Sequence, residues 1–296
     1  MPIGLGARDR LAVGLIVGLP LALVVGFIWL PTGASVLLSL TSWDGVGGLE
    51  SIRFSGLDNY HDLLTVQPAF ERAVRNNLLW LLGLLLVATP LGVLFALLLD
   101  RRLRGSAFYE SALYLPVVLS LALVGLIWQL QFAPEQGLIN NLLGTTRQDN
   151  LVDWLGNRDL NIWAALVAGG WRHVGYITLL YLAGLRSVDP TLREAAAIDG
   201  ASEWQAFRRV VLPVLAPVNA VVLIVTVIEA VRAFDIVYVL NRGQNGLELL
   251  SILVVNSLLG EASRIGFGSA VATLLLLLAI TPIALYLRRA FRGFAT

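Results

Sequence analysis

Three charged residues stand at steps of three in an otherwise apolar stretch of the sequence. On a helix over 214–239, Glu229, Arg232 and Asp235 fall within an arc of about 120°. A lone charge at the centre of a bilayer costs about 2.5–3.5 kcal/mol on insertion scales, so such residues usually face a protein interior or a water path. These three can hydrogen-bond the hydroxyl groups of a polar solute. They can equally form a structural ion-pair cluster, and the sequence leaves both interpretations open.

Aromatic and basic side chains gather in a second apolar stretch, residues 160–185. Trp171 and Tyr176 are candidate contacts on a solute path, because aromatic rings stack on the faces of cyclic polar solutes. The alternative is packing or anchoring at the membrane interface, which is the commoner role of Trp and Tyr in membrane proteins. His173, next to Arg172, is expected to form an interhelical hydrogen bond.

The residue types that are absent exclude several kinds of chemistry. The 296 residues include no cysteine and no lysine, so all 21 residues counted as Lys or Arg are arginine. A thiol nucleophile, a zinc–thiolate site, a Schiff base and the lysine of a phosphate-binding P-loop are therefore excluded. His61 and His173 are the only histidines, and no nucleophile–base pair stands out. We expect a chain that is not an enzyme and binds no metal or cofactor.

Composition predicts an all-α integral membrane protein. Hydrophobic residues are 57% and charged residues 14%, with a mean hydropathy of +0.78. Soluble domains are about 45–50% apolar and about 25% charged. One apolar run, 247–259, is too short to span a bilayer and is expected to form an interfacial or re-entrant helix. The net charge of +1 offers no basic patch for nucleic acid. Six stretches have the length of spanning helices: 11–30, 78–99, 111–133, 160–185, 214–239 and 269–287.

The distribution of arginine predicts the orientation of these spans. Cytoplasmic segments of membrane proteins carry an excess of Lys and Arg, so the arginine-rich side is the cytoplasm and both termini lie there. The first stretch is longer than a signal-peptide core and is expected to be retained. The expected organisation is an N-terminal helix with an outer loop over 1–72, then a five-helix core over 73–296. Arginine is more than twice as dense on one side as on the other, in segments 1–10, 100–110, 186–213 and 288–296.

The arginine-rich segment 186–213 begins with strong signals for a short helix. Asp189 is a good N-cap, and Pro190 suits the first helical position. Gly200 suits the left-handed residue that follows a helix end. A helix of about eight residues is marginal alone in water, so we expect it to pack on a partner surface.

A second short helix is expected in the same segment. Ser202 and Gln205 form a capping box at its start. Pro213 should push Leu212 away from helical geometry and produce a bend before the next span.

The same segment resembles a known motif. The run Glu194-Ala195-Ala196, then Gly200, then Leu212-Pro213, resembles the EAA motif of ATP-binding cassette importer permeases. The resemblance covers most of the chain and is closest to the sugar-type permeases. The short end after the last span favours the first permease of such pairs. Other matching segments are Phe54-x-Gly56-Leu57-x-Asn59-Tyr60, Asn76-Asn77, Leu182-Ala183-Gly184-Leu185, Asp199-Gly200-Ala201-Ser202 and Phe234-Asp235-x-x-Tyr238.

The resemblance implies a fold, a function and a set of partners. It implies six transmembrane helices of the type I importer fold in a prokaryotic inner membrane. It implies a second, different permease subunit, two ATPase subunits that bind ATP and Mg, and an extracellular solute-binding lipoprotein. The solute would be a sugar, an oligosaccharide or a polyol or glycerol phosphate ester. The residues implied in coupling to the ATPase are Glu194, Ala195, Ala196, Ile198, Asp199, Gly200, Ala201, Leu212 and Pro213.

Two local departures and one alternative function remain. Tyr109-Glu110 and the run 241–245 differ from the pattern of the family, which puts local contacts in doubt. The alternative is a secondary transporter driven by an ion gradient. Its mark would be inverted repeats with broken helices at matching positions, and no convincing repeat is visible.

Overall fold

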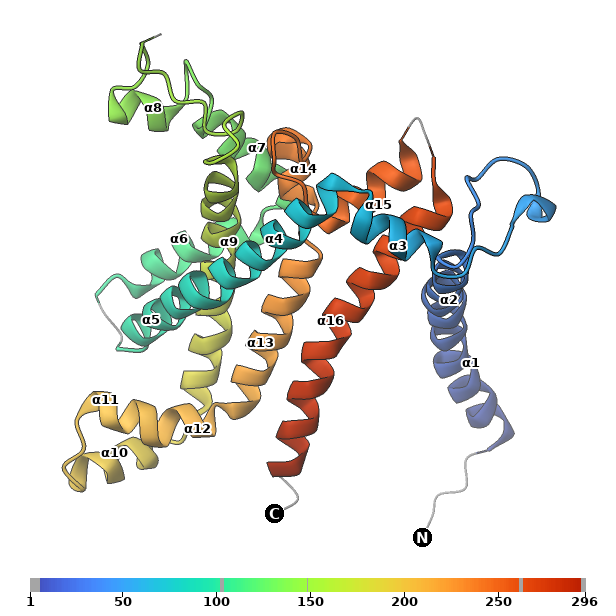
Figure 1. The fold of residues 1–296 in the computed structure, drawn as a ribbon. Helices are drawn as coiled ribbons and strands as arrows, with labels where there is room; N and C mark the ends of the chain where they lie inside the picture. Colours follow the sequence, from blue (N-terminus) through green and yellow to red (C-terminus); the bar gives the residue numbers. More distant parts are fainter. Residues whose placement is uncertain (1–5, 102–103, 148, 261–262, 294–296) are drawn as a thin grey trace. The chain divides into compact units, whose positions relative to one another are not determined.

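The computed structural model describes residues 6–101, 104–147, 149–260 and 263–293, and these residues are mostly helical (Figure 1). They form two compact units. The first contains the described residues up to Gln67 together with Val254–Leu274. The second contains Pro68–Leu253 and the described residues from Leu275 onward. The division of the chain at residue 72 stays a prediction.

The first unit opens with one long apolar helix. Its parts are α1 (Ala7–Val24), a wide π-helical turn η1 (Val25–Trp29) and α2 (Leu30–Leu38). The segment Leu11–Leu38 is long and apolar enough to cross a membrane, as the sequence predicted. Pro31 has no N–H to donate, and its ring would clash with a carbonyl group of a regular α-helix. The wide turn precedes the proline, and the helix continues through it.

An asparagine organises the loop that follows α2. Asn59 lies on α3 (Asp58–Thr65), and its amide nitrogen donates to the carbonyl oxygens of Ser39 at 2.9 Å and Thr41 at 2.7 Å. The hydroxyl groups of Ser39 and Tyr60 lie 2.8 Å apart. The 3-10 turn η2 (Leu49–Ser51) lies between them in sequence. Both Asn59 and Tyr60 belong to the signature recognised in the sequence, and here they close this loop.

The second unit begins with a continuous helix of 33 residues, Pro68–Asp100. It extends well beyond the predicted second span. It is followed by a bent pair of helices, by the short α8 and by α9, a helix of 27 residues. The elements, in order, are α4 (Pro68–Gly83), η3 (Leu84–Ala88), α5 (Thr89–Asp100), α6 (Ser106–Val118), α7 (Leu121–Gln131), α8 (Leu138–Leu143) and α9 (Asn161–Ser187).

The rest of the second unit consists of short helices around a broken span. Two elements belong partly to each unit: α15 (Leu250–Leu259) and α16 (Ile265–Gly293). The run 247–259 is thus helical over most of its length, and its place at the membrane stays a prediction. The remaining elements are α10 (Pro190–Ile198), α11 (Glu203–Ala206), η4 (Phe207–Val211), α12 (Leu212–Val214), α13 (Ala216–Val231) and α14 (Asp235–Asn241).

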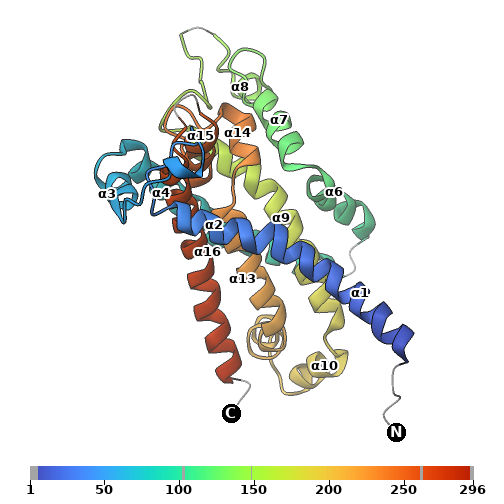
Figure 2. The ribbon, with the colours of Figure 1, turned by 90° about the vertical axis from the view of Figure 1, so that its right-hand side faces the viewer.

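Helix α9 is the centre of the second unit. It packs against α4, α5, α6, α7, α13 and α14. Figures 1 and 2 both show α10 at one end of α9 and α8 at the other. Two apolar cores form along α9, one around Trp80, Ala165 and Val237, the other around Ala96, Ile177 and Leu182. The two helices that carry Glu229 and Asp235, α13 and α14, are therefore both held on α9.

The third predicted span, 111–133, is not one straight helix. It consists of α6 and α7, which meet at 103°. Leu119 is extended, and the Ser120 hydroxyl accepts from the Leu123 N–H at 3.2 Å to cap the new helix. The apolar composition continues through the break, so periodicity alone does not reveal it.

Of the six predicted spans, the described residues account for five by length and composition once the bends are allowed for. Within the part of the chain that the structure describes, three helices are long and apolar enough to cross a membrane: Leu11–Leu38, Pro68–Asp100 and Ile265–Tyr286. Two bent pairs raise the count to five by length and composition. Helix α9, with 27 residues, has the length of the sixth but lies outside that set. Which side faces the cytoplasm stays a prediction.

Candidate functional site

The segment 186–213, called here the EAA loop, begins with the predicted capped helix. The Asp189 carboxylate accepts from the backbone N–H of Thr191 at 2.9 Å, and Pro190 is the first residue of α10. This backbone hydrogen bond, with help from the Thr191 hydroxyl, lowers the pKa of Asp189 below its ordinary value of 3.8. The cap is therefore charged and formed at neutral pH.

The end of α10 is equally well defined. Gly200 has a φ of +77°, its N–H donates to the Ala197 carbonyl at 3.1 Å, and the Ala201 N–H donates to the Ala196 carbonyl at 3.0 Å. These two bonds form a Schellman motif, which satisfies carbonyl groups that a helix end leaves free. The predicted glycine turn is confirmed.

The second short helix starts as predicted, but the bend after it lies elsewhere. Ser202 and Gln205 form the capping box. Leu212 is helical, with φ −62° and ψ −39°, so the prediction that Pro213 displaces it was wrong. The wide turn η4 precedes the proline, and the Leu212 N–H donates to the Phe207 carbonyl. This widening leaves room for a proline ring, and the chain bends by 77° after Val214 instead.

The EAA loop presents an exposed face beyond its packed base. Ala196 is buried at the base, whereas Glu194 and Ala195 are exposed and the Ile198 side chain is 87% exposed. Trp204 is 64% exposed on the second helix. Asp199, next to Ile198, is exposed at the helix end. The exposed residues of the EAA loop thus include two large apolar side chains, Ile198 and Trp204.

A cavity of about 270 Å³ lies inside the second unit, and we call it the charged cavity. Trp80, Gly169 and Phe234 form part of its apolar wall. The Arg172 guanidinium and the Glu229 carboxylate lie 3.7 Å apart. Its charged or titratable wall residues are Arg172, His173, Glu229, Arg232 and Asp235.

The three charges at steps of three do reach one cavity, but along a different path from the predicted single helix face. Helix α13 ends at Val231, and α14 begins at Asp235. Arg232 and Asp235 therefore flank a break in the helix, and Glu229 pairs with Arg172 of α9. The Arg172 Nε atom is buried and has no hydrogen-bond partner within the described part of the chain. The cavity thus holds both signs of charge and a free donor.

The break in the fifth span is stabilised by side chains from distant segments. The Asn77 amide nitrogen of α4 donates to the Ala230 carbonyl at 3.1 Å, and its oxygen accepts from the Leu250 N–H at 2.9 Å. The Ser251 hydroxyl donates to the Ala233 carbonyl at 2.5 Å. Carbonyl groups freed by a helix break must find partners in a membrane interior. No local sequence signal could reveal these pairings, because the partners are more than 150 positions apart in the case of Asn77.

The two aromatic candidates on α9 lie elsewhere. Trp171 packs edge-to-face on Trp128, with ring centroids 5.9 Å apart. Tyr176 packs against the second apolar core. Neither belongs to the cavity wall as far as the structure describes it. Trp80 does line the cavity wall. This residue was not predicted from the sequence, because nothing in its apolar run distinguishes it from its neighbours. A role for Trp171 and Tyr176 on a solute path stays a prediction.

His173 behaves as the sequence predicted. Its Nε2 atom lies 3.2 Å from the Thr226 hydroxyl of α13 and 3.4 Å from the Thr89 hydroxyl of α5. The buried ring thus links three helices by hydrogen bonds. The described residues hold no cluster of three or more His, Cys, Asp or Glu side chains that could bind a metal ion.

A bent helical bundle with a charged cavity inside and a capped helix at one end defines a membrane permease. The chain matches the family described as binding-protein-dependent transport system inner membrane component over residues 88–293, and it belongs to that family. The match also leaves the secondary transporter without support.

Relatives of known name cover nearly the whole chain. A probable ABC transporter permease of Pyrococcus horikoshii is 30% identical over 279 residues, covering 93% of this chain and 94% of the relative. The xylose/arabinose import permease XacH of Haloferax volcanii is 33% identical, covering 91% and 85%. The trehalose/maltose permease MalF of Thermococcus litoralis is 32% identical, covering 90% of each chain.

A solved structure shares the fold. The bacterial ABC transporter involved in import of the acidic polysaccharide alginate contains a chain with a TM-score of 0.79 and 21% identity, covering 96% of both chains. The type I importer permease fold predicted from the sequence is thus confirmed.

Proposed function

We propose that this chain is one membrane subunit of an ATP-driven importer for a sugar or related polar solute. It forms half of the translocation path, in the inner membrane of a prokaryotic cell. The observation that carries the proposal is the EAA loop: a rigid, doubly capped helix with Glu194 and Ile198 exposed outside the apolar bundle. Such a helix can transmit force only if a partner protein binds it.

The energy comes from partner subunits. The chain has no lysine and so cannot build a P-loop of its own. Two copies of an ATPase subunit, which bind ATP and Mg, are the partners that the exposed face of α10 fits. The EAA residues act at two levels: Glu194, Ala195, Ile198 and Asp199 contact the ATPase, whereas Ala196, Gly200, Ala201, Leu212 and Pro213 hold the shape.

The other partners complete the path. A second, different permease supplies its other half, and an extracellular lipoprotein delivers the solute. The family description includes dependence on a binding protein. One structure of similar fold is described as a complex with an alginate-bound periplasmic protein. Membrane lipids surround the apolar surface.

The class of solute is inferred from the cavity and from the relatives. Names of relatives refer to xylose/arabinose, trehalose/maltose and arabinooligosaccharides. Hydroxyl groups accept from arginine and donate to carboxylates, and the charged cavity offers both kinds of partner. A polyol or glycerol phosphate ester is the second candidate, favoured by Arg172 and Arg232 in the cavity wall.

The test of the proposal is recovery of the complex. Tagged chain is isolated from native membranes in mild detergent, and the bound proteins are identified by mass spectrometry. An ATPase, a second permease and a binding lipoprotein are expected. Recovery of the chain alone from intact membranes would overturn the proposal.

Two matched variants locate the ATPase contact. Ile198→Asp should lower ATPase recovery about tenfold, which corresponds to about 1.4 kcal/mol of binding free energy. Leu142→Asp on α8 changes another highly exposed apolar residue, at the other end of α9, and should leave recovery unchanged. The ligand of the recovered lipoprotein then identifies the solute.

A further inference from the structure

The C-terminal end of α5 carries an ion pair in which each charge is unfavourable for the dipole of its own helix. The Arg193 guanidinium of α10 lies 2.6 Å from the Asp100 carboxylate of α5. Asp100 is the last residue of α5, and Arg193 stands in the first turn of α10. A helix dipole disfavours an anion at the C-terminus and a cation at the N-terminus. Each charge is therefore compensated by the other helix and not by its own.

The Arg193 side chain joins three elements. Its second terminal nitrogen donates to the Leu185 carbonyl of α9 at 3.4 Å. The side chain of Asp100 is only 15% exposed and that of Arg193 39% exposed, so water screens this pair less than a surface pair. The two residues lie in the wall of a cavity of about 610 Å³ between α5 and the EAA loop.

The helix that carries Asp100 is closely packed on α9. Gly92 of α5 lies against Ile177 of α9, where an added Cβ atom would be 2.7 Å from the Ile177 Cβ atom. The Thr178 hydroxyl of α9 donates to the Gly92 carbonyl at 3.2 Å. Contacts this close favour displacement of α5 and α9 together, because close-packed elements transmit strain.

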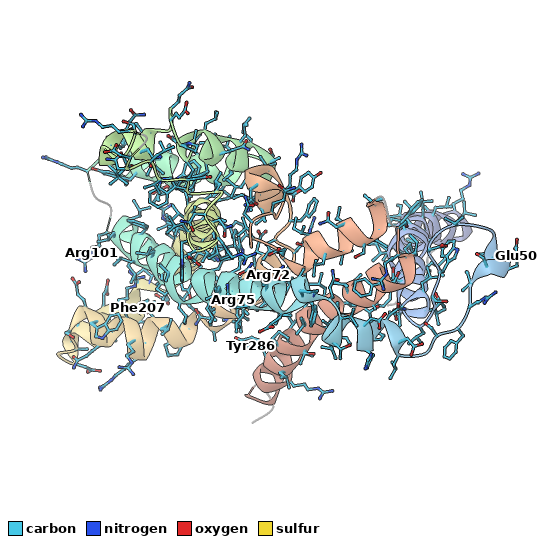
Figure 3. The ribbon with its side chains drawn as sticks, turned by 45° about the horizontal axis from the view of Figure 1, so that its top comes forward. Glu50, Arg72, Arg75, Arg101, Phe207 and Tyr286 are labelled. Carbon is cyan, nitrogen blue, oxygen red and sulfur yellow. The ribbon has the colours of Figure 1, made fainter. Side chains whose placement is uncertain are left out.

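The same helix passes the charged cavity near its middle, where Trp80 and Leu84 line the cavity wall. The continuous helix Pro68–Asp100 has a length of about 50 Å. Near its start, the Asn76 amide donates to the carbonyl oxygens of Gly246 at 2.7 Å and Glu248 at 2.9 Å. Asn77 bonds to Ala230, which precedes the break in the fifth span, and to Leu250, which follows it in sequence. Arg72 pairs with Glu248 at 3.3 Å, and Figure 3 shows Arg72 and Arg75 on this stretch of α4.

We propose that the Asp100–Arg193 pair ties the EAA loop to the second span, and that this span carries displacement of the loop to the charged cavity. The inference rests on the proposed function, because it needs ATPase subunits that displace the loop. Asp100 and Arg193 are positioning residues: they touch neither solute nor nucleotide. Asn77 delivers the displacement to the broken fifth span through Ala230, and Asn76 delivers it to the loop at Gly246 and Glu248.

A neighbouring pair provides an internal control. Arg101 pairs with Glu203 of α11, and both side chains are mostly exposed, at 61% and 82%. Figure 3 labels Arg101 at the end of α5 and Phe207 in the EAA loop, and both residues line the cavity of about 610 Å³. Arg101 caps the C-terminus of α5, and Glu203 begins α11, so each charge suits its own helix dipole. Exposed pairs of this kind contribute little, and this one should be dispensable.

The experiment measures coupling in the assembled complex. Complexes with the ATPase subunits are reconstituted in lipid vesicles, and ATP hydrolysis is measured with and without the solute-loaded binding protein. Asp100→Asn and Arg193→Gln should each lower the stimulation by the binding protein at least about fivefold, the lower end of typical coupling factors. Arg101→Gln should keep the stimulation of the unmodified complex.

A charge exchange separates positioning from folding. The double variant Asp100→Arg with Arg193→Asp keeps the pair and also places each charge at the helix end that its dipole favours, so stimulation should return. Single variants that keep full stimulation, or an exchange that performs no better than the single variants, would overturn the inference. If the unmodified chain recovers no ATPase, the proposed function fails. If it recovers ATPase and Asp100→Asn stays coupled, only the inference fails.

Discussion

The EAA loop and the charged cavity are built in opposite ways. The loop is shaped by contacts between residues a few positions apart: Asp189 with Thr191, Gly200 with Ala197, and Ser202 with Gln205. The cavity is assembled from segments far apart in sequence. The difference shows that the shape of a local motif depends on contacts within the motif, whereas the shape of a cavity depends on the packing of the whole unit.

Breaking a long-range bond of the cavity should have the largest effect. Asn77→Leu removes the amide that satisfies the Ala230 carbonyl and the Leu250 N–H. Each buried group left without a partner costs about 1–3 kcal/mol. The midpoint of thermal unfolding in detergent should fall clearly. Leu78→Ala at the next, exposed position is the control, and an unchanged midpoint for Asn77→Leu would contradict the account of the break.

A change at the glycine turn should be smaller and confined to the loop. A valine at position 200 would have to adopt a φ of +77°, at a cost of about 1–2 kcal/mol. An added Cβ atom meets nothing within 4 Å, so the cost is one of backbone conformation alone. Gly200→Val should lower ATPase recovery and leave the thermal midpoint nearly unchanged. Gly200→Asn, which tolerates this conformation, should recover most of the ATPase.

Loss of a cap should cost less again. Ser202→Ala removes the hydroxyl that accepts from the Gln205 N–H at 3.3 Å, worth about 1 kcal/mol. Amide hydrogen exchange at Gln205 should become faster. Ser202→Asp restores an acceptor and should slow exchange again, and a failure of this rescue would argue against the capping box.

The smallest expected effect is a pH dependence of the first cap. Because the folded pKa of Asp189 is lowered, its stabilisation of α10 is complete above the ordinary pKa of 3.8 and is lost as the pH falls through the folded pKa. Exchange at the Thr191 amide, corrected for the intrinsic rate, should therefore rise only in acid. Asp189→Asn, a neutral cap, should remove this dependence. A transition above pH 3.8 in the unmodified chain would contradict the assignment.

Much of the fold could be predicted because its signals are local or compositional. Apolar length indicates the first, second and last spans, and cap chemistry indicates α10 and α11. The bend at Ser120 and the break after Val231 could not be predicted, because apolar residues continue through both. The expected bend at Leu212 was displaced because η4 gives the proline room.

The sequence by itself determined the class of protein, the spans and the shape of the EAA loop, since these depend on composition and on residues a few positions apart. Tertiary structure alone decided which charges meet. It paired Glu229 with Arg172 and Asp100 with Arg193, and it brought the Asn77 amide to the Ala230 carbonyl at the break in the fifth span. The reason is physical: partners for a buried charge or carbonyl group are chosen by packing in three dimensions, which no short stretch of sequence encodes.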